Sequence, residues 1–208
     1  MSKKRAPARR LRQSERTELS DQRMIDTAIR ILLRQGISGL RMTEVGLQAG
    51  YSRGLAAMRF GTVGGLLRRV ARHLTERWLE AVNEAVGDKK GLAAIHAVID
   101  AQERLLAPPA SAYHVQFLIL SHSMDPGTVD RIHANRVLAA QHRDLARWIR
   151  EGIRAGEVRG DIEPAAEAQS ILGSMIGITY RSLMDPAVRP ARPSAKLKGE
   201  IEARLRAR

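Results

Sequence analysis

Residues 45–60 read VGLQAGYSRGLAAMRF, and this stretch decides the fold of the amino-terminal part of the chain. It predicts a short helix, a tight turn at Gly50 and a second short helix, the arrangement known as helix-turn-helix. Gly46 and Ala49 are small enough for two helices to cross closely, and Gly50 can adopt the positive φ that ends a helix. Helical hairpins are common in proteins, so this motif alone does not indicate a function, and the sequence around it has to be considered.

The second helix of the motif carries side chains that can contact DNA. We expect Ser52 to be its N-cap and also to bind phosphate, because the first amides of a helix lack partners within the helix. Arg53 and Arg59 then project from a helix slim enough for the major groove. The alternative for both arginines is a solvated surface position.

The charge around the motif is strongly basic. Residues 1–72 contain sixteen Lys and Arg against five Asp and Glu, which is +11 of the net +13 of the 208-residue chain. The last twenty residues add +5, so the middle of the chain is mildly acidic. This distribution predicts a polyanionic partner at the amino-terminal end, either nucleic acid or an anionic membrane bound through residues 1–16.

The amino-acid composition and the absence of known catalytic motifs argue against several other classes of protein. Cys is absent, which excludes disulfide frameworks, zinc ribbons and cysteine nucleophiles, and aromatic residues make up only 3%, too few for a base-stacking single-strand binder. Gly61, Gly64 and Gly65 are not followed by the Lys-Ser/Thr of a phosphate-binding loop, and no hydrolase or metalloprotease motif occurs. We therefore expect no enzyme activity, no cofactor and no bound metal. Without a signal peptide or an apolar stretch of about 20 residues, we expect a cytoplasmic protein with no membrane partner.

Beyond the motif, apolar residues recur at helical spacing along the whole chain, and no stretch alternates as a half-buried strand does. The sequence therefore predicts an all-α fold. The predicted helices cover residues 24–35, 41–49, 52–60, 62–87, 92–105, 113–122, 128–155, 165–184 and 197–205.

With these helices in place, the motif resembles that of TetR-type transcriptional regulators, whose DNA-binding run reads roughly I-A-x-x-A-G-V-S-x-G-x-L-Y-x-x-F-x-S-K-x-x-L. The positions that match without a gap are Val45, Gly46, Ala49, Gly50, Tyr51, Ser52, Gly54, Phe60, Thr62 and Leu66. Residues 25–36 resemble the first helix of the family, and residues 152–164 resemble the loop before its dimerisation helices. The resemblance covers about residues 20–185.

The resemblance implies a set of DNA-contacting residues, with some departures from the family pattern. Ala57 and Val63 stand where the family usually has a Tyr and a Lys that contact phosphate, and Arg41 stands where a Ser or Thr usually caps the first helix of the motif. Tyr51 either contacts DNA or packs in the core of the domain. The candidate DNA-binding residues are Arg41, Thr43, Tyr51, Ser52, Arg53, Leu55, Met58 and Arg59.

The resemblance also implies a domain order. We expect a disordered basic arm at residues 1–18, the DNA-binding domain at 19–67, an effector-binding and dimerisation domain at 68–188, and a basic tail or short helix at 189–208. An unknown small molecule would bind inside the helical bundle, although each candidate residue also suits an ordinary core. The effector-pocket candidates are Trp78, Val82, Ile99, Tyr113, Phe117, His133 and Trp148.

Small residues at helical spacing in residues 165–184 predict a close helix–helix contact across a two-fold axis. The candidate interface residues are Ser170, Gly173, Gly177 and Tyr180; packing against another helix of the same chain is the alternative. Together these features predict a homodimeric, ligand-responsive repressor that binds a palindromic operator and lies on the bacterial nucleoid when bound. A non-specific architectural nucleic-acid-binding protein is the alternative.

Overall fold

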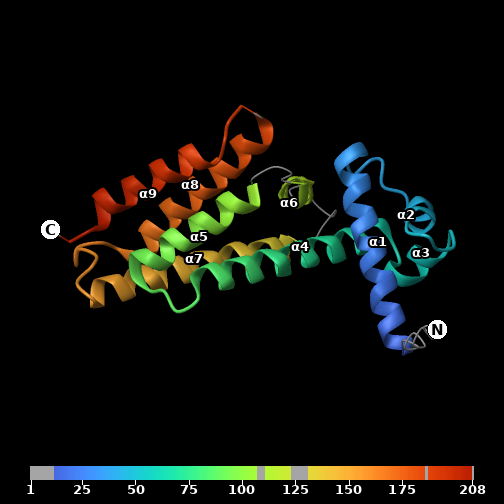
Figure 1. Cartoon of the computed structure of the whole chain (residues 1–208), viewed down its shortest axis with the longest axis horizontal. Helices are drawn as coiled ribbons and strands as arrows, with labels where there is room; N and C mark the ends of the chain where they lie inside the picture. Colours follow the sequence, from blue (N-terminus) through green and yellow to red (C-terminus); the bar gives the residue numbers. More distant parts are fainter. Residues whose placement is uncertain (1–11, 107–110, 123–130, 186, 208) are drawn as a thin grey trace, which may run out of the picture. The chain divides into compact units, whose positions relative to one another are not determined.

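The computed structural model describes residues 12–106, 111–122, 131–185 and 187–207, without the side chains of residues 111–113 and 131–134. These ranges contain nine α-helices and no strand beyond one isolated bridge, so the predicted all-α fold class is confirmed (Figure 1). The helices are α1 (Gln13–Gln35), α2 (Met42–Gln48), α3 (Leu55–Phe60), α4 (Val63–Val86), α5 (Gly91–Leu106), α6 (Ser111–His122), α7 (Arg131–Arg154), α8 (Pro164–Met184) and α9 (Ala191–Leu205).

The chain divides into two compact units after Val70, which we call the amino-terminal and the carboxy-terminal unit. The amino-terminal unit consists of α1, α2, α3 and the first two turns of α4, and its apolar side chains converge on one small core. The fully buried members of this core include Met24, Ala28, Val45, Ala56, Leu66 and Val70.

No helix in the described ranges is long and apolar enough to cross a membrane.

Helix α1 begins earlier than the sequence predicted. Residues 13–18, which we expected to belong to a disordered arm, are helical, whereas residues 1–11 lie outside the described part of the chain. The Oε2 atom of Glu15 accepts a hydrogen bond of 2.6 Å from the backbone N–H of Arg12 at the start of the helix. This contact gives a partner to an amide that the helix cannot satisfy. The prediction failed because it followed apolar periodicity, and this first part of α1 is polar.

The carboxy-terminal unit is a bundle in which α7 packs against α5 and α8, and α9 packs against α5 and α8 (Figure 1). The segment 189–208, for which a tail and a helix both remained open, forms α9 over Ala191–Leu205. Leu197, Ile201 and Leu205 of α9 are buried in the core of the unit. The end of α9 is also tied to the loop before α8, because the backbone N–H of Arg159 donates to the carbonyl of Leu205 at 2.9 Å.

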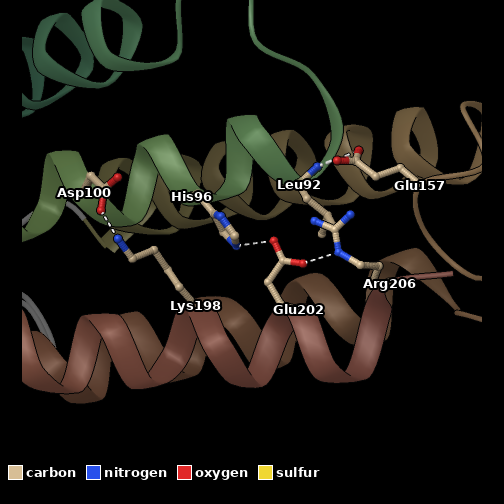
Figure 2. Close-up of polar contacts among 7 residues, drawn as sticks. All are labelled: Leu92, His96, Asp100, Glu157, Lys198, Glu202 and Arg206. Atoms are coloured by element: carbon tan, nitrogen blue, oxygen red, sulfur yellow. Dashed lines mark hydrogen bonds and ion pairs between the residues drawn. The ribbon is translucent and has the colours of Figure 1, made fainter. Parts of the chain in front are cut away.

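Polar contacts run along the face between α5 and α9, as Figure 2 shows. Lys198 pairs with Asp100 at 2.5 Å, and Glu202 lies between His96 at 3.6 Å and Arg206 at 2.5 Å. These contacts fix α9, which is rich in Lys and Arg, against α5 in the bundle.

The same figure shows how α5 begins. The Glu157 carboxylate accepts a 3.0 Å hydrogen bond from the backbone N–H of Leu92. Gly91 has φ +55°, and a Cβ there would overlap that carboxylate. A side chain at position 91 would therefore be strained and would displace the Glu157 carboxylate from this hydrogen bond.

Candidate nucleic-acid interface

The helix-turn-helix consists of α2, a turn over residues 49–54, and α3. Gly50 has φ +83°, as predicted for the residue that ends the first helix, and the N–H of Tyr51 donates to the carbonyl of Gly46 at 2.9 Å. A Cβ at Gly46 would lie 2.5 Å from the backbone oxygen of Ser52. Such a distance is too short for any side-chain carbon, so the turn folds back over α2 only because position 46 is glycine.

The prediction that Ser52 is the N-cap of the second helix is wrong. Helix α3 starts at Leu55, its N-cap is Gly54, and no side chain caps it. The turn takes up residues 52–54 before the helix begins, and the backbone oxygen of Ser52 accepts a hydrogen bond of 3.2 Å from the N–H of Leu55. The Ser52 side chain is exposed. Its role as a phosphate ligand stays a prediction.

The long helix that follows, α4, has a side-chain cap at its start. The Thr62 Oγ1 atom accepts a hydrogen bond of 3.1 Å from the backbone N–H of Gly65. A Cβ at Gly65 would overlap the backbone oxygen of Phe60, so a glycine is needed where the end of α3 meets the start of α4.

The outer face of α3 is exposed and mostly apolar. Ala56 is fully buried, and successive residues of a helix are rotated by about 100°, so Met58 points away from the core. Met58 is 73% exposed, the highest value among the large apolar side chains of the described residues. Ala57 beside it is also exposed, whereas Leu55 and Tyr51 are half-buried.

The two arginines of the motif differ in their surroundings. Arg59 donates from Nε to Asp21 Oδ1 at 2.8 Å and from Nη2 to Asp21 Oδ2 at 2.7 Å, which ties α3 to α1. The hydrogen bond to Asp21 raises the pKa of Arg59 above its ordinary value. Arg53, in contrast, is exposed and has no hydrogen bond or ion pair with any residue that the structure describes. Sequence spacing could not reveal Asp21, since it lies 38 residues from its partner.

The remaining candidates lie around α2. Arg41 is the N-cap residue of α2 without capping it by its side chain; its guanidinium instead donates to the backbone oxygen of Ser38 at 2.6 Å. Thr43 is exposed in the first turn of α2. All eight candidate DNA-binding residues therefore belong to one continuous motif. Of its three arginines, Arg41 and Arg59 have hydrogen-bond partners, whereas the guanidinium of Arg53 has none among the described residues.

A cavity of about 250 Å³ lies in the carboxy-terminal unit among α4, α5, α7 and α8. Trp78, Val82 and Trp148 of the effector-pocket candidates line it. Ile99 is buried in the core without lining the cavity, and Phe117 packs on Tyr180 with ring centroids 5.6 Å apart. The side chains of Tyr113 and His133 lie outside the described part of the chain.

The rim of the cavity carries polar groups that the sequence did not single out. Arg147 lies 5.4 Å from the ring centroid of Trp148 and pairs with Asp144 at 3.1 Å. Lys89 also lines the cavity, and its Nζ donates to the backbone oxygen of Ala85 at 2.8 Å. Asp144 and Arg147 are three residues apart on α7, which indicates that they share a face of the helix. The cavity beside them, however, forms only when the helices of the bundle pack together. No group of three or more His, Asp or Glu side chains suited to a metal ion occurs in the described residues.

Comparison with known proteins identifies the architecture. Neither a protein-family model nor a curated protein sequence matches the chain. Many solved structures resemble it, and three of them show the extent of the likeness. A putative transcriptional regulator from Saccharomonospora viridis in complex with choline has a TM-score of 0.81 at 17% identity, with 92% of this chain and 100% of that chain covered. A TetR transcriptional regulator from Chloroflexus aurantiacus has a TM-score of 0.77 at 16% identity (93% and 99% covered). SmeT, the repressor of the Stenotrophomonas maltophilia multidrug efflux pump SmeDEF, has a TM-score of 0.72 at 13% identity (89% and 90% covered).

The chain has the TetR-family fold. The resemblance drawn from residues 45–66 and the predicted helices is thus confirmed at the level of the fold. In this TetR-type fold, α2, the turn and α3 form the helix-turn-helix, and the cavity lies within the helical bundle that follows it in the chain.

In this TetR-type bundle the four candidate interface residues lie on the exposed face of α8. A Cβ added at Gly173 or Gly177 would meet no atom within 4 Å. The opposite face, with Ile171, Leu172 and Met175, packs into the bundle. Gly173 and Gly177 therefore do not pack against another described helix of the same chain, whereas Tyr180 packs on Phe117 of α6. The dimer contact stays a prediction.

Proposed function

We propose that this protein is a dimeric, ligand-responsive transcriptional regulator that represses its target by binding a palindromic DNA operator. The observation that carries this proposal is the exposed face of α3 next to Arg53, which has no partner among the described residues, on the strongly basic amino-terminal unit. A helix of this kind fits the major groove, and the basic surface would bind the phosphate backbone. The regulator acts in the cytoplasm, associates with the nucleoid when bound, and has no catalytic role, cofactor or membrane partner.

In this proposal the residues around α3 position the protein on DNA. Thr43, Ser52 and Arg41 lie at the start of α2 or in the turn and would contact phosphate. Contacts of this kind position a protein on DNA without reading the sequence. Ala57 and Val63 cannot supply the phosphate contacts that Tyr and Lys make in the family pattern. The exposed Arg68 and Arg69 at the start of α4 are available to replace them.

The dimer would form through the exposed face of α8. Gly173 and Gly177 leave room for a second helix to approach closely, and a two-fold axis brings the same face of each protomer together. Helix α9 adds a second small-residue face, since Ala195, Gly199 and Ala203 are exposed at four-residue spacing. Such a dimer presents two α3 helices to half-sites that lie about 34–36 Å apart, or at multiples of that distance.

The effector would bind in the cavity of the carboxy-terminal unit. Two indole rings and several aliphatic side chains form its walls, and charged groups lie at its rim, which suits a small amphipathic molecule. Helix α4 is continuous from the amino-terminal core at Leu66 to the cavity wall at Val82. A ligand that shifts α4 would therefore change the distance between the two DNA-binding heads and release the operator.

The test is selection from a random pool of double-stranded DNA with the full chain at near-physiological salt. Enrichment of a palindrome supports a dimeric, sequence-specific regulator. DNA that binds without enrichment and is lost steeply as salt rises would instead indicate a non-specific architectural protein, because only the electrostatic part of binding would be present. Absence of DNA binding by the ligand-free protein would contradict the proposal.

A further inference from the structure

The face of α3 that points away from the core offers few hydrogen-bonding groups. Ala56 faces inward, and the exposed residues of the helix are Ala57, Met58 and Arg59. Methionine has no strong donor or acceptor, and alanine has none. A helix that reads base edges through hydrogen bonds usually carries Arg, Asn or Gln at such positions.

The charged residue on the same helix is held by the protein itself. Both nitrogens that Arg59 uses are bound to the two oxygens of Asp21, in a bidentate geometry that has to be broken before this side chain can contact a base. Arg53, which precedes α3, is the other guanidinium of the motif. The centre of the exposed helix face is therefore apolar.

Among the base edges of the major groove, thymine alone presents a methyl group, and an apolar side chain can recognise it by excluding water from it. Methionine suits this contact because its thioether is flexible and polarizable. The positive charge of the unit supplies the attraction to the DNA backbone that an apolar contact lacks.

We propose that Met58, with Ala57 beside it, reads a thymine in each half-site through the C5-methyl group. This inference rests on the proposed function, since it requires α3 to enter the major groove. It predicts an A·T pair in each half-site at a position where the methyl group rather than a hydrogen bond supplies the discrimination.

The experiment begins with the operator enriched from the random DNA pool. Each thymine of the half-site is replaced in turn, in both half-sites, by deoxyuridine, which lacks only the methyl group. Burial of one methyl group is worth about a fourfold change in affinity, so loss of both from a palindrome is expected to weaken binding by about fifteenfold. Affinity is measured for the full-length wild type and for Met58→Ala.

A control variant is Leu33→Ala, since Leu33 is a 39% exposed apolar residue on α1, outside the helix-turn-helix and outside the proposed dimer face of α8. Met58 is exposed as well, so its replacement removes no core contact, and thermal unfolding of both variants is expected to match the wild type.

The inference is supported if deoxyuridine at one position weakens the wild type and the Leu33→Ala variant by about fifteenfold but changes the affinity of Met58→Ala less than twofold. It is overturned if the operator is specific and no thymine responds, or if the response persists in Met58→Ala. A pool in which no sequence is enriched would overturn the proposed function, and this inference with it.

Discussion

The two units of this chain build their candidate sites in opposite ways. In the amino-terminal unit, the candidate DNA-binding residues come from one continuous stretch, residues 41–59, and most of their side chains are exposed. In the carboxy-terminal unit, the cavity is lined by side chains from four helices, and Trp78 and Trp148 are almost completely buried. An exposed site on a local motif can be changed without disturbing the core, whereas the cavity is part of the core itself.

The largest effect is expected where the local motif depends on backbone contact. In Gly46→Ala the new Cβ would collide with the backbone oxygen of Ser52, so the turn must shift, at a cost of about 1–3 kcal/mol in stability of the unit. We expect loss of specific DNA binding and faster hydrogen exchange in α2 and α3. Gly54→Ala is the control for stability, because its Cβ meets no atom within 4 Å. Equal hydrogen exchange in the two variants would contradict this account.

A second large effect is expected from Gly173→Arg on α8. A side chain there has open space in the single chain but would prevent the close approach of a second copy. The variant is expected to be a folded monomer by sedimentation, and to bind the palindrome about a hundredfold more weakly, since the gain from two linked half-sites is lost. Gly160→Arg adds the same charge in open loop space and should remain a dimer. A dimeric Gly173→Arg would exclude α8 from the interface.

Arg53→Ala tests the exposed arginine of the motif. Removal of a base-contacting guanidinium is expected to weaken operator binding about tenfold to a hundredfold. The melting temperature should not change, because Arg53 has no partner among the described residues. Arg143→Ala, at an exposed position of α7, controls for the loss of one positive charge. Unchanged operator affinity in Arg53→Ala would remove this residue from the interface.

The cavity can be tested through tryptophan fluorescence, because both tryptophans of the chain line it. Small amphipathic compounds are titrated into the protein. A compound that releases the operator is expected to change the emission with the same concentration dependence and to raise the melting temperature. Release of the operator without any change in emission would mean that the effector binds elsewhere.

The smallest effect is expected from the Arg59–Asp21 pair. Asp21→Asn would free the guanidinium for a phosphate and remove one negative charge, so non-specific DNA affinity should rise about twofold to threefold, with a steeper salt dependence. The lost ion pair is partly exposed and should cost less than about 1 kcal/mol of stability. Asp26→Asn is the matched control, because the carboxylate of Asp26 accepts a hydrogen bond from Gln22 rather than pairing with an arginine. The same rise in both variants would mean that net charge alone is responsible.

The predictions from sequence succeeded where the deciding interactions are local. The turn at Gly50 and the helices of the bundle follow from residues a few positions apart. The Ser52 cap was predicted by the same reasoning and is wrong, because a tight turn can use one more or one fewer residue before a helix starts. Helix starts are set by competing hydrogen bonds of similar energy.

The sequence by itself determined the all-α class, the helix-turn-helix and the basic end of the chain, because helical periodicity, glycine turns and charge are properties of neighbouring residues. Only the tertiary structure decided that Asp21 binds Arg59, that the small face of α8 is exposed, and that Trp78 and Trp148 meet at one cavity. These outcomes depend on which segments, far apart in the chain, pack together, and residue spacing within one helix does not specify that.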